Sequence, residues 1–172
     1  MDNERKKYRV AVVGGAGMWG RHYLQTFAER EDCDVVLVDS STSRAKQFAE
    51  EFGITDMFVS LDELLQREVP DIVANILPVR LSYEAVISCA EAGVKVVSCE
   101  KPIAVELKQA DEMVRICKDT GTAFACATAH WEVPHLRATA KWLRDGNFGS
   151  ILSASIPGGL PIEVSGAGCV QL

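Results

Sequence analysis

A lysine stands between a glutamate and a proline where a strand-like run of the sequence ends. The run is Val94–Cys99, and Glu100, Lys101 and Pro102 follow it directly. A lysine ammonium can hydrogen-bond a hydroxyl or carbonyl oxygen and can polarise or move its proton. Pro102 fixes the turn, and a cis Lys101–Pro102 bond would be one way to aim the lysine side chain. The alternative is a solvent-exposed ion pair between Glu100 and Lys101 at the start of a loop.

Three glycines near the N-terminus have the spacing of a dinucleotide-binding motif. Gly15, Gly17 and Gly20 form G-x-G-x-x-G, which follows an apolar run and opens a predicted helix. We expect Gly15 to allow a tight turn, Gly17 to let the backbone approach a pyrophosphate, and Gly20 to permit close packing of helix on strand. The N–H groups at the helix start, with Met18 and Trp19 among the contact residues, would bind the phosphates. The alternative is a glycine turn without a ligand.

Asp39 ends the next apolar run, at the distance from the glycines that suits a ribose-binding carboxylate. A carboxylate there can accept hydrogen bonds from both ribose hydroxyls of an adenosine, and it would repel a 2′-phosphate. Ser40, Ser41 and Arg44 keep NADP open, because a serine and an arginine can hold a 2′-phosphate. For Arg44 the alternative is a solvated position on its own helix. The sequence favours NAD as the cofactor and leaves NADP as the second choice.

The elements that must position these residues alternate between strand and helix. Continuous apolar strands separated by amphipathic helices predict an α/β fold with a doubly wound parallel sheet. Ligands of such sheets bind beyond the carboxyl ends of the strands. We therefore expect Asp39, Leu77–Pro78 and Glu100–Pro102 to lie at one edge of the sheet. The expected strands are Tyr8–Val13, Val35–Val38, Met57–Val59, Asp71–Leu77, Val94–Cys99, Thr122–Ala129 and Ile151–Ile156, and the expected helices are Met18–Glu29, Ser43–Phe52, Leu61–Arg67, Leu81–Ala92, one from Leu107 through Cys117, and Pro134–Arg144.

Composition and charge exclude several classes of protein. The chain has 172 residues, of which 48% are hydrophobic and 24% charged, and its formal net charge is −6. This acidic balance argues against a nucleic-acid partner, because no basic face is available to bind phosphates. The sequence has no apolar run of the ~20 residues that a membrane helix needs. We expect no signal peptide, no membrane partner and a cytoplasmic location.

Six cysteines are present, and none of them forms a C-x-x-C pair. The spacing therefore signals neither a zinc site nor a redox dithiol, and we expect no metal. Cys89, Cys99, Cys117 and Cys126 fall within apolar patterns, where a thiol acts as a small hydrophobic side chain.

Taken together, these motifs resemble the Gfo/Idh/MocA family, named after glucose-fructose oxidoreductase and inositol dehydrogenase. The resemblance rests on "GGAGMWG", "VDSSTSRAKQFAEEFGI", "SLDELL", "PDIVANILP", "AVISCAEAGVKVVSCEKPIAV" and "HLRATAKWLRDGNFGSI". It implies an N-terminal Rossmann domain that binds NAD or NADP and a C-terminal α/β substrate domain. It also implies oxidation or reduction of a hydroxyl or keto carbon on a sugar, cyclitol or related small molecule.

The resemblance assigns roles to particular residues. The lysine of the family's EKP motif maps onto Lys101, which makes it the expected catalytic residue. Ser82 stands where the family often has a histidine, and His130 is at best a residue of the substrate pocket. We expect Ser82 to contact the cofactor, as well as Leu77, Pro78, Glu100 and Lys101 from the strand ends.

The resemblance also divides the chain. We expect a dinucleotide-binding domain over residues 1–128 and the start of a substrate or oligomerisation domain over residues 129–172. Family members are about twice this length, so the resemblance implies that most of the second domain, with its general acid/base, is absent. Leu136, Ala140 and Leu143 are expected to face inward from their helix. An apolar edge strand near the C-terminus predicts self-association or disorder after about Ser150, and we expect a homo-oligomer.

Two other functions remain as hypotheses. One is a non-catalytic dinucleotide-binding module with a regulatory or interaction role, which Val170 favours slightly because a histidine often stands there in the family. The other is a Rossmann domain that binds a different nucleotide. Asp39 argues against a ligand that lacks an adenosine ribose.

Overall fold

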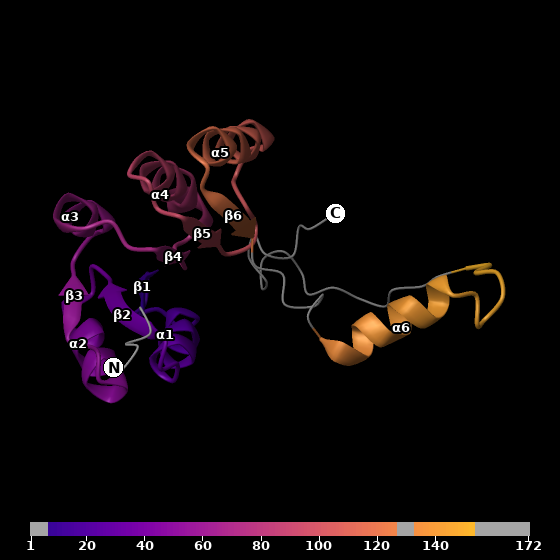
Figure 1. Ribbon diagram of the computed structural model, residues 1–172, viewed down its shortest axis with the longest axis horizontal. Helices are drawn as coiled ribbons and strands as arrows, with labels where there is room; N and C mark the ends of the chain where they lie inside the picture. Colours follow the sequence, from indigo (N-terminus) through magenta and orange to yellow (C-terminus); the bar gives the residue numbers. More distant parts are fainter. Residues whose placement is uncertain (1–6, 127–132, 154–172) are drawn as a thin grey trace, which may run out of the picture. The chain divides into compact units, whose positions relative to one another are not determined.

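The computed structural model describes residues 7–126 and 133–153, and the chain divides into two units, residues 1–126 and 127–172. In the first unit, parallel strands form one six-stranded sheet in the order β3-β2-β1-β4-β5-β6 (Figure 1). The strands are β1 (Tyr8–Val13), β2 (Cys33–Val38), β3 (Asp56–Phe58), β4 (Ile72–Asn75), β5 (Val96–Cys99) and β6 (Ala123–Cys126). The helices between them are α1 (Gly20–Ala28), α2 (Thr42–Phe52), α3 (Leu61–Arg67), α4 (Val79–Glu91) and α5 (Leu107–Thr120).

The order of the strands reverses between β1 and β4, which lie side by side at the centre of the sheet. Val13 at the end of β1 is paired with Val38 of β2 on one side and with Asn75 of β4 on the other. This is the strand order of the Rossmann fold, whose ligands bind at the reversal point. The predicted doubly wound parallel sheet is therefore confirmed.

The helices cover both faces of the sheet, because alternate strand residues point to opposite sides. On one face Val12 and Leu37 pack with Leu24 of α1 and with Ala45 and Ala49 of α2. The other face packs against α3, α4 and α5. Its fully buried members include Val36, Leu64, Val73, Val86, Val97 and Met113.

Local signals explain where several helices begin and end. The Ser60 hydroxyl accepts a hydrogen bond from the N–H of Glu63 at 3.1 Å, and the Glu63 carboxylate accepts one from the N–H of Val59 at 3.1 Å. The Ser60 cap, together with the bond from Val59 to Glu63 in the first turn, starts α3. Gly53 and Gly121 end α2 and α5 in left-handed conformations with φ of 67° and 78°. Gly53 therefore has the stop role that its sequence position predicted.

Most predicted elements of the first unit are confirmed, with small differences at their ends. α3 has the predicted bounds, whereas α1 begins two residues later than expected and the strand expected over Asp71–Leu77 is shortened to β4. The last strand expected in this unit, Thr122–Ala129, appears as β6, and its final residues lie outside the described ranges.

The second unit is described only over residues 133–153. Its helix α6 (Pro134–Arg144) has the predicted bounds, with Pro134 in the first turn. It buries none of its residues, and Leu136 and Leu143 are exposed, so the prediction that they face inward is wrong for the described chain. Residues 151–153 form no strand, contrary to the expected Ile151–Ile156, whose remainder lies outside the described ranges.

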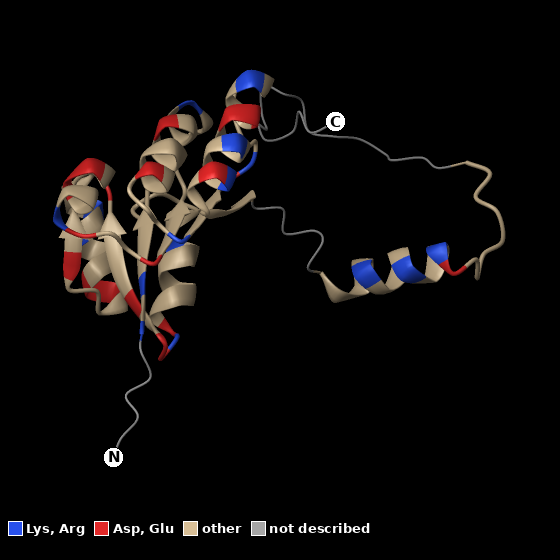
Figure 2. Cartoon of the chain, turned by 45° about the horizontal axis from the view of Figure 1, so that its top comes forward, with Lys and Arg blue, Asp and Glu red and all other residues tan. Residues whose placement is uncertain are grey.

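Charged side chains are distributed over the helices of the first unit. Figure 2 shows acidic residues on most of these helices, with basic residues interspersed. Over the described ranges, no helix is both long enough and apolar enough to cross a membrane.

Candidate functional site

The glycine loop, residues 14–20, connects β1 to α1 and is held against β2. The N–H groups of Gly14 and Gly15 donate to the Val38 carbonyl at 2.8 and 3.3 Å. Gly14 has φ of +79°, and a Cβ at this position would lie 2.7 Å from the carbonyl oxygen of Ile76. The left-handed turn thus occurs at Gly14 and not at Gly15, where the motif placed it. Sequence reasoning missed Gly14, although the Gly14–Gly15 pair was visible.

The three motif glycines occupy different environments. A Cβ on Gly20 would lie 2.6 Å from the carbonyl oxygen of Gly15, so only glycine lets α1 start this close to the loop. A Cβ on Gly15 would meet Val12 at 3.1 Å and Leu37 at 3.2 Å. A Cβ on Gly17 would meet only the Gly14 carbonyl within 4 Å, at 3.1 Å, so its outer side is open. This open backbone is what a pyrophosphate requires.

The N-terminus of α1 is suited to an anion. Trp19 precedes the helix without a capping side-chain bond, and the first turn contains no acidic residue. The side chains of Met18 and Trp19 are exposed. Because no side chain caps α1 and its first turn has no acid, the positive end of its dipole can bind phosphate.

Asp39 directly follows β2, and its carboxylate contacts both the glycine loop and the residues that follow β2. Its Oδ2 accepts a hydrogen bond from the N–H of Ala16 at 2.9 Å, and its Oδ1 accepts one from the N–H of Ser41 at 2.7 Å. The carboxylate is therefore already oriented beside the glycine loop. Ser40 and Arg44 are exposed, and the Arg44 guanidinium donates through Nε to the Ser41 hydroxyl at 3.2 Å.

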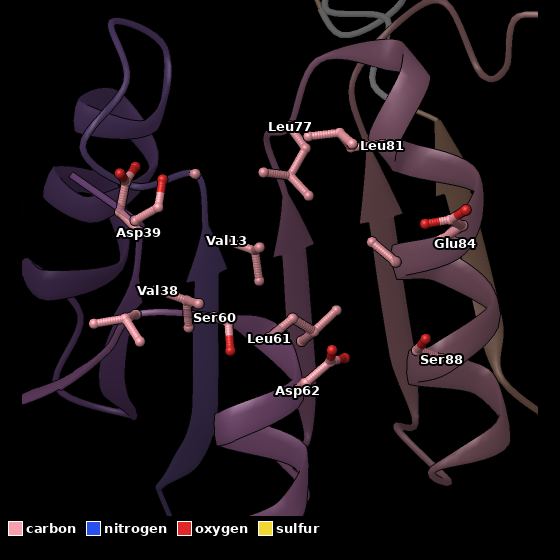
Figure 3. A pocket seen from close by; sticks show the side chains of 14 residues that line it. Val13, Val38, Asp39, Ser60, Leu61, Asp62, Leu77, Leu81, Glu84 and Ser88 are labelled. Carbon is pink, nitrogen blue, oxygen red and sulfur yellow. The ribbon is translucent and has the colours of Figure 1, made fainter.

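A pocket of about 640 Å³ opens beside Asp39, between α3 and α4 (Figure 3). Three of its lining residues are acidic, namely Asp39, Asp62 and Glu84, and none is basic. An acidic lining disfavours a phosphate, whereas the apolar residues of the lining suit a flat ring. Arg44 does not line the pocket, so the interpretation of Arg44 as a solvated residue is favoured. The lining residues are Val13, Gly14, Val38, Asp39, Ser40, Val59, Ser60, Leu61, Asp62, Leu77, Leu81, Glu84, Ala85 and Ser88.

Only some of the residues predicted to bind the cofactor line this pocket. Asp39, Ser40 and Leu77 line it, whereas Pro78 and Ser82 do not. Ser82 is completely buried, and its hydroxyl has no hydrogen-bond partner in the described chain. The buried side-chain nitrogen of Asn75, at the end of β4, also lacks a partner there. Contact of Ser82 with the cofactor stays a prediction.

The end of β5 carries the turn with Lys101. The peptide bond between Lys101 and Pro102 is cis, as the sequence suggested. The Lys101 side chain is exposed and forms no ion pair or hydrogen bond with the described residues. Glu100 instead accepts a hydrogen bond at Oε1 from the Tyr23 hydroxyl at 2.6 Å, so the Glu100–Lys101 ion pair considered as the alternative does not form. His130, the candidate pocket residue, lies outside the described ranges.

Tyr23 is a residue that sequence reasoning missed. It lies on α1, and 77 positions separate it from Glu100. Burial, together with the hydrogen bond to Glu100, raises the pKa of Tyr23 above its ordinary value. The hydroxyl therefore stays protonated and donating at neutral pH.

The chain is similar in sequence to known proteins. The model of the Gfo/Idh/MocA family, described as an oxidoreductase family with an NAD-binding Rossmann fold, matches residues 8–128. The chain is 34% identical over 147 residues to a 2,7-anhydro-N-acetylneuraminate hydratase of Mediterraneibacter gnavus, which covers 86% of this chain and 38% of that protein. It is 32% identical over 118 residues to D-glucoside 3-dehydrogenase of Escherichia coli, covering 68% of this chain and 33% of that protein.

Solved structures share the fold. Myo-inositol 2-dehydrogenase from Lactobacillus plantarum superposes with a TM-score of 0.78 and 20% identity, covering 85% of this chain and 43% of that one. Scyllo-inositol dehydrogenase from Lactobacillus casei, solved with NAD(H) and scyllo-inositol, superposes with a TM-score of 0.77 and 19% identity. The match covers 85% of this chain and 43% of that one. The chain thus spans less than half the length of the proteins it matches here.

Proposed function

The chain belongs to the Gfo/Idh/MocA oxidoreductase family, and from this membership we propose that it binds NAD and forms the cofactor-binding part of an oxidoreductase. The proposed substrate is a sugar, a cyclitol or a related small molecule with a hydroxyl or keto carbon. The observation that carries the proposal is the glycine loop bonded through Ala16 to Asp39, at the reversal point of a Rossmann sheet. The names of the two relatives above support a carbohydrate-like substrate.

The described residues fit a dinucleotide. The open backbone at Gly17 and the N-terminus of α1 would receive the pyrophosphate, and Asp39 would accept the ribose hydroxyls. The pocket beside Asp39 would receive the adenine. Because this pocket is acidic and Arg44 is turned to Ser41, we propose NAD over NADP.

Lys101 is the proposed catalytic residue. A bound nicotinamide would supply the hydride acceptor or donor. Lys101 would donate a hydrogen bond to the substrate oxygen and assist the movement of its proton. This role is supported by the place of Lys101 at the carboxyl end of β5 and by its freedom from ion pairs within the described chain.

Other parts of the proposal concern the whole protein. We propose that residues 129–172 begin a substrate or oligomerisation domain and that the protein forms homo-oligomers in the cytoplasm. A non-catalytic module is not favoured, because the two curated relatives above carry enzyme names. Since one of them is named a hydratase, an assay should follow the substrate as well as the reduction of NAD.

The test is calorimetric titration of the chain with NADH and with NADPH, followed by a screen of sugars and cyclitols. We expect NADH to bind at micromolar concentration and NADPH more weakly. If the screen finds a substrate that the wild type converts, Lys101→Met should abolish the rate of that conversion. Lys95→Met is the matched control, because Lys95 precedes the same strand at its opposite end and pairs with Asp71.

The outcomes separate the alternatives. Binding of neither dinucleotide would contradict the proposed function. Binding of NADH without turnover by this chain alone would fit a cofactor-binding part, whereas lack of turnover by a longer chain that also carries the second domain would favour the non-catalytic module. An equal loss of rate in the Lys101 and Lys95 variants would contradict the proposed catalytic role of Lys101.

A further inference from the structure

Glu100, directly after β5, forms three contacts with other elements of the first unit. Its N–H donates to the Asn75 carbonyl of β4 at 3.2 Å, and its own carbonyl accepts a contact from the Cys126 thiol of β6 at 3.8 Å. Its carboxylate accepts the Tyr23 hydroxyl at 2.6 Å. The first two contacts hold the backbone directly, whereas the Tyr23 bond holds the side chain and restrains the turn through it.

Tyr23 connects two parts of the candidate site that are distant in the sequence. It stands three positions after Gly20, in the first turns of the helix that begins at the glycine loop. Glu100 directly precedes Lys101. The Tyr23–Glu100 bond therefore ties the helix of the phosphate loop to the turn that carries the lysine.

We propose that Tyr23 is a positioning residue of the nicotinamide end of the site, acting through the Glu100 carboxylate. The inference rests on the proposed function, because it takes NAD as the ligand. The bond holds the Glu100 carboxylate in one position and restrains the turn that carries Lys101. Without the Tyr23 hydroxyl, the half-buried Glu100 carboxylate loses its hydrogen-bond donor and must bind water or a cation instead.

The chain contains a matched control. Tyr83 of α4 donates to Glu112 of α5 at 2.8 Å, which is a second tyrosine–glutamate bond between two elements of the same unit. Neither Tyr83 nor Glu112 lines the pocket or belongs to the glycine loop. Tyr83→Phe therefore removes the same kind of bond without touching the proposed site.

The test measures two properties of NADH on the full chain. Affinity reports mainly the phosphate and ribose contacts, whereas the emission of bound NADH, excited directly, reports the surroundings of the nicotinamide. For Tyr23→Phe we expect an altered emission with an affinity changed by less than about threefold, since the glycine loop and Asp39 remain. Exchange of the backbone amides of Glu100, Lys101 and Ile103 should become at least about fivefold faster. Tyr83→Phe should keep the emission of the wild type and the exchange of this turn.

A double-variant cycle tests the route through Glu100. If Tyr23 acts through this carboxylate, Tyr23→Phe combined with Glu100→Gln should change the emission no more than Glu100→Gln alone. Additive changes would overturn the proposal, and so would wild-type emission in Tyr23→Phe. A wild-type chain that fails to bind NADH would instead contradict the proposed function, so the two failures are distinguishable.

Discussion

The Asp39 carboxylate accepts a hydrogen bond from the backbone N–H of Ala16 at 2.9 Å, which joins the end of β2 to the glycine loop. Its other oxygen accepts the N–H of Ser41 at 2.7 Å. The residue that would bind the ribose therefore also shapes the loop that would bind the phosphates. Both parts of the site depend on one carboxylate.

Asp39→Ala should weaken NADH binding by at least about tenfold. The substitution removes charge-assisted hydrogen bonds, which are worth about 1.5–3 kcal/mol each, and it frees the glycine loop. Because the repulsion of a 2′-phosphate also disappears, the preference for NADH over NADPH should narrow. Calorimetry with both dinucleotides measures the two effects. Asp62→Ala is the control, because Asp62 lines the same pocket without a hydrogen bond to the described residues. An equal loss in both variants would contradict a special role for Asp39.

Gly20→Ala and Gly17→Ala should separate folding from binding. A Cβ at position 20 would lie 2.6 Å from the Gly15 carbonyl oxygen, so the backbone must move. We expect a loss of about 1–3 kcal/mol in the free energy of unfolding, measured by urea denaturation. At position 17 the added Cβ has open space outside and a 3.1 Å neighbour inside. Gly17→Ala should therefore keep most of the stability and lose NADH affinity. Normal affinity in Gly17→Ala would contradict the pyrophosphate role.

The sequence predicts the parts of the site that depend on local patterns. The motif Gly15–Gly20 and the following Asp39 were identifiable because residue type and spacing alone define them. The same spacing does not reveal which glycine adopts positive φ. That depends on the approach of Ile76, directly after the neighbouring strand β4, to the loop at Gly14.

Contacts between distant segments were not predictable in the same way. Tyr23 and Glu100 are 77 positions apart, and no periodicity connects them. The apolar stripe of α6 correctly predicted a helix, but it could not show that Leu136 and Leu143 are exposed in the described chain. Amphipathicity indicates a face that can be buried, and burial also requires a surface to cover it.

Arg9 should be a major electrostatic contributor to stability. Its guanidinium contacts Asp34 at 2.7 Å, Asp56 at 2.5 Å and Glu68 at 2.7 Å, and its side chain is only 21% exposed. Burial lowers the pKa of Arg9, but the hydrogen bonds to these carboxylates outweigh burial and raise it overall. Arg9→Met should lower the free energy of unfolding by about 1–3 kcal/mol, because three carboxylates lose their shared partner.

The control for Arg9 is Arg30→Met, which removes an exposed pair with Asp32. This variant should lose clearly less stability than Arg9→Met, because water and salt screen an exposed pair. Urea denaturation at low and high salt measures both variants. Screening by salt should reduce the difference between Arg9→Met and the wild type. Equal stabilities of the two variants at low salt would contradict the proposed contribution of Arg9.

Buried thiols should make the stability of the first unit decline at alkaline pH. Burial raises the pKa of Cys89 and of Cys99 from 9.0 to about 12. Because the folded state favours the thiol over the thiolate, this contribution is fully present below about pH 9 and is lost as the pH rises toward 12. Each thiol should cost about 1.4 kcal/mol per pH unit in this window. Cys89→Ala removes one of them and should therefore reduce the decline.

Urea denaturation at pH 8 and pH 10.5 tests this prediction. At pH 8, Cys89→Ala should be less stable than the wild type, because a small cavity replaces the sulfur. By pH 10.5 this deficit should shrink by about 2 kcal/mol, since the variant has no thiol to ionise at this position. Val86→Ala, also fully buried on α4 but without a titrating group, should keep the same deficit at both pH values. A Cys89→Ala deficit that is independent of pH would show that Cys89 ionises as readily in the folded state as in the unfolded state.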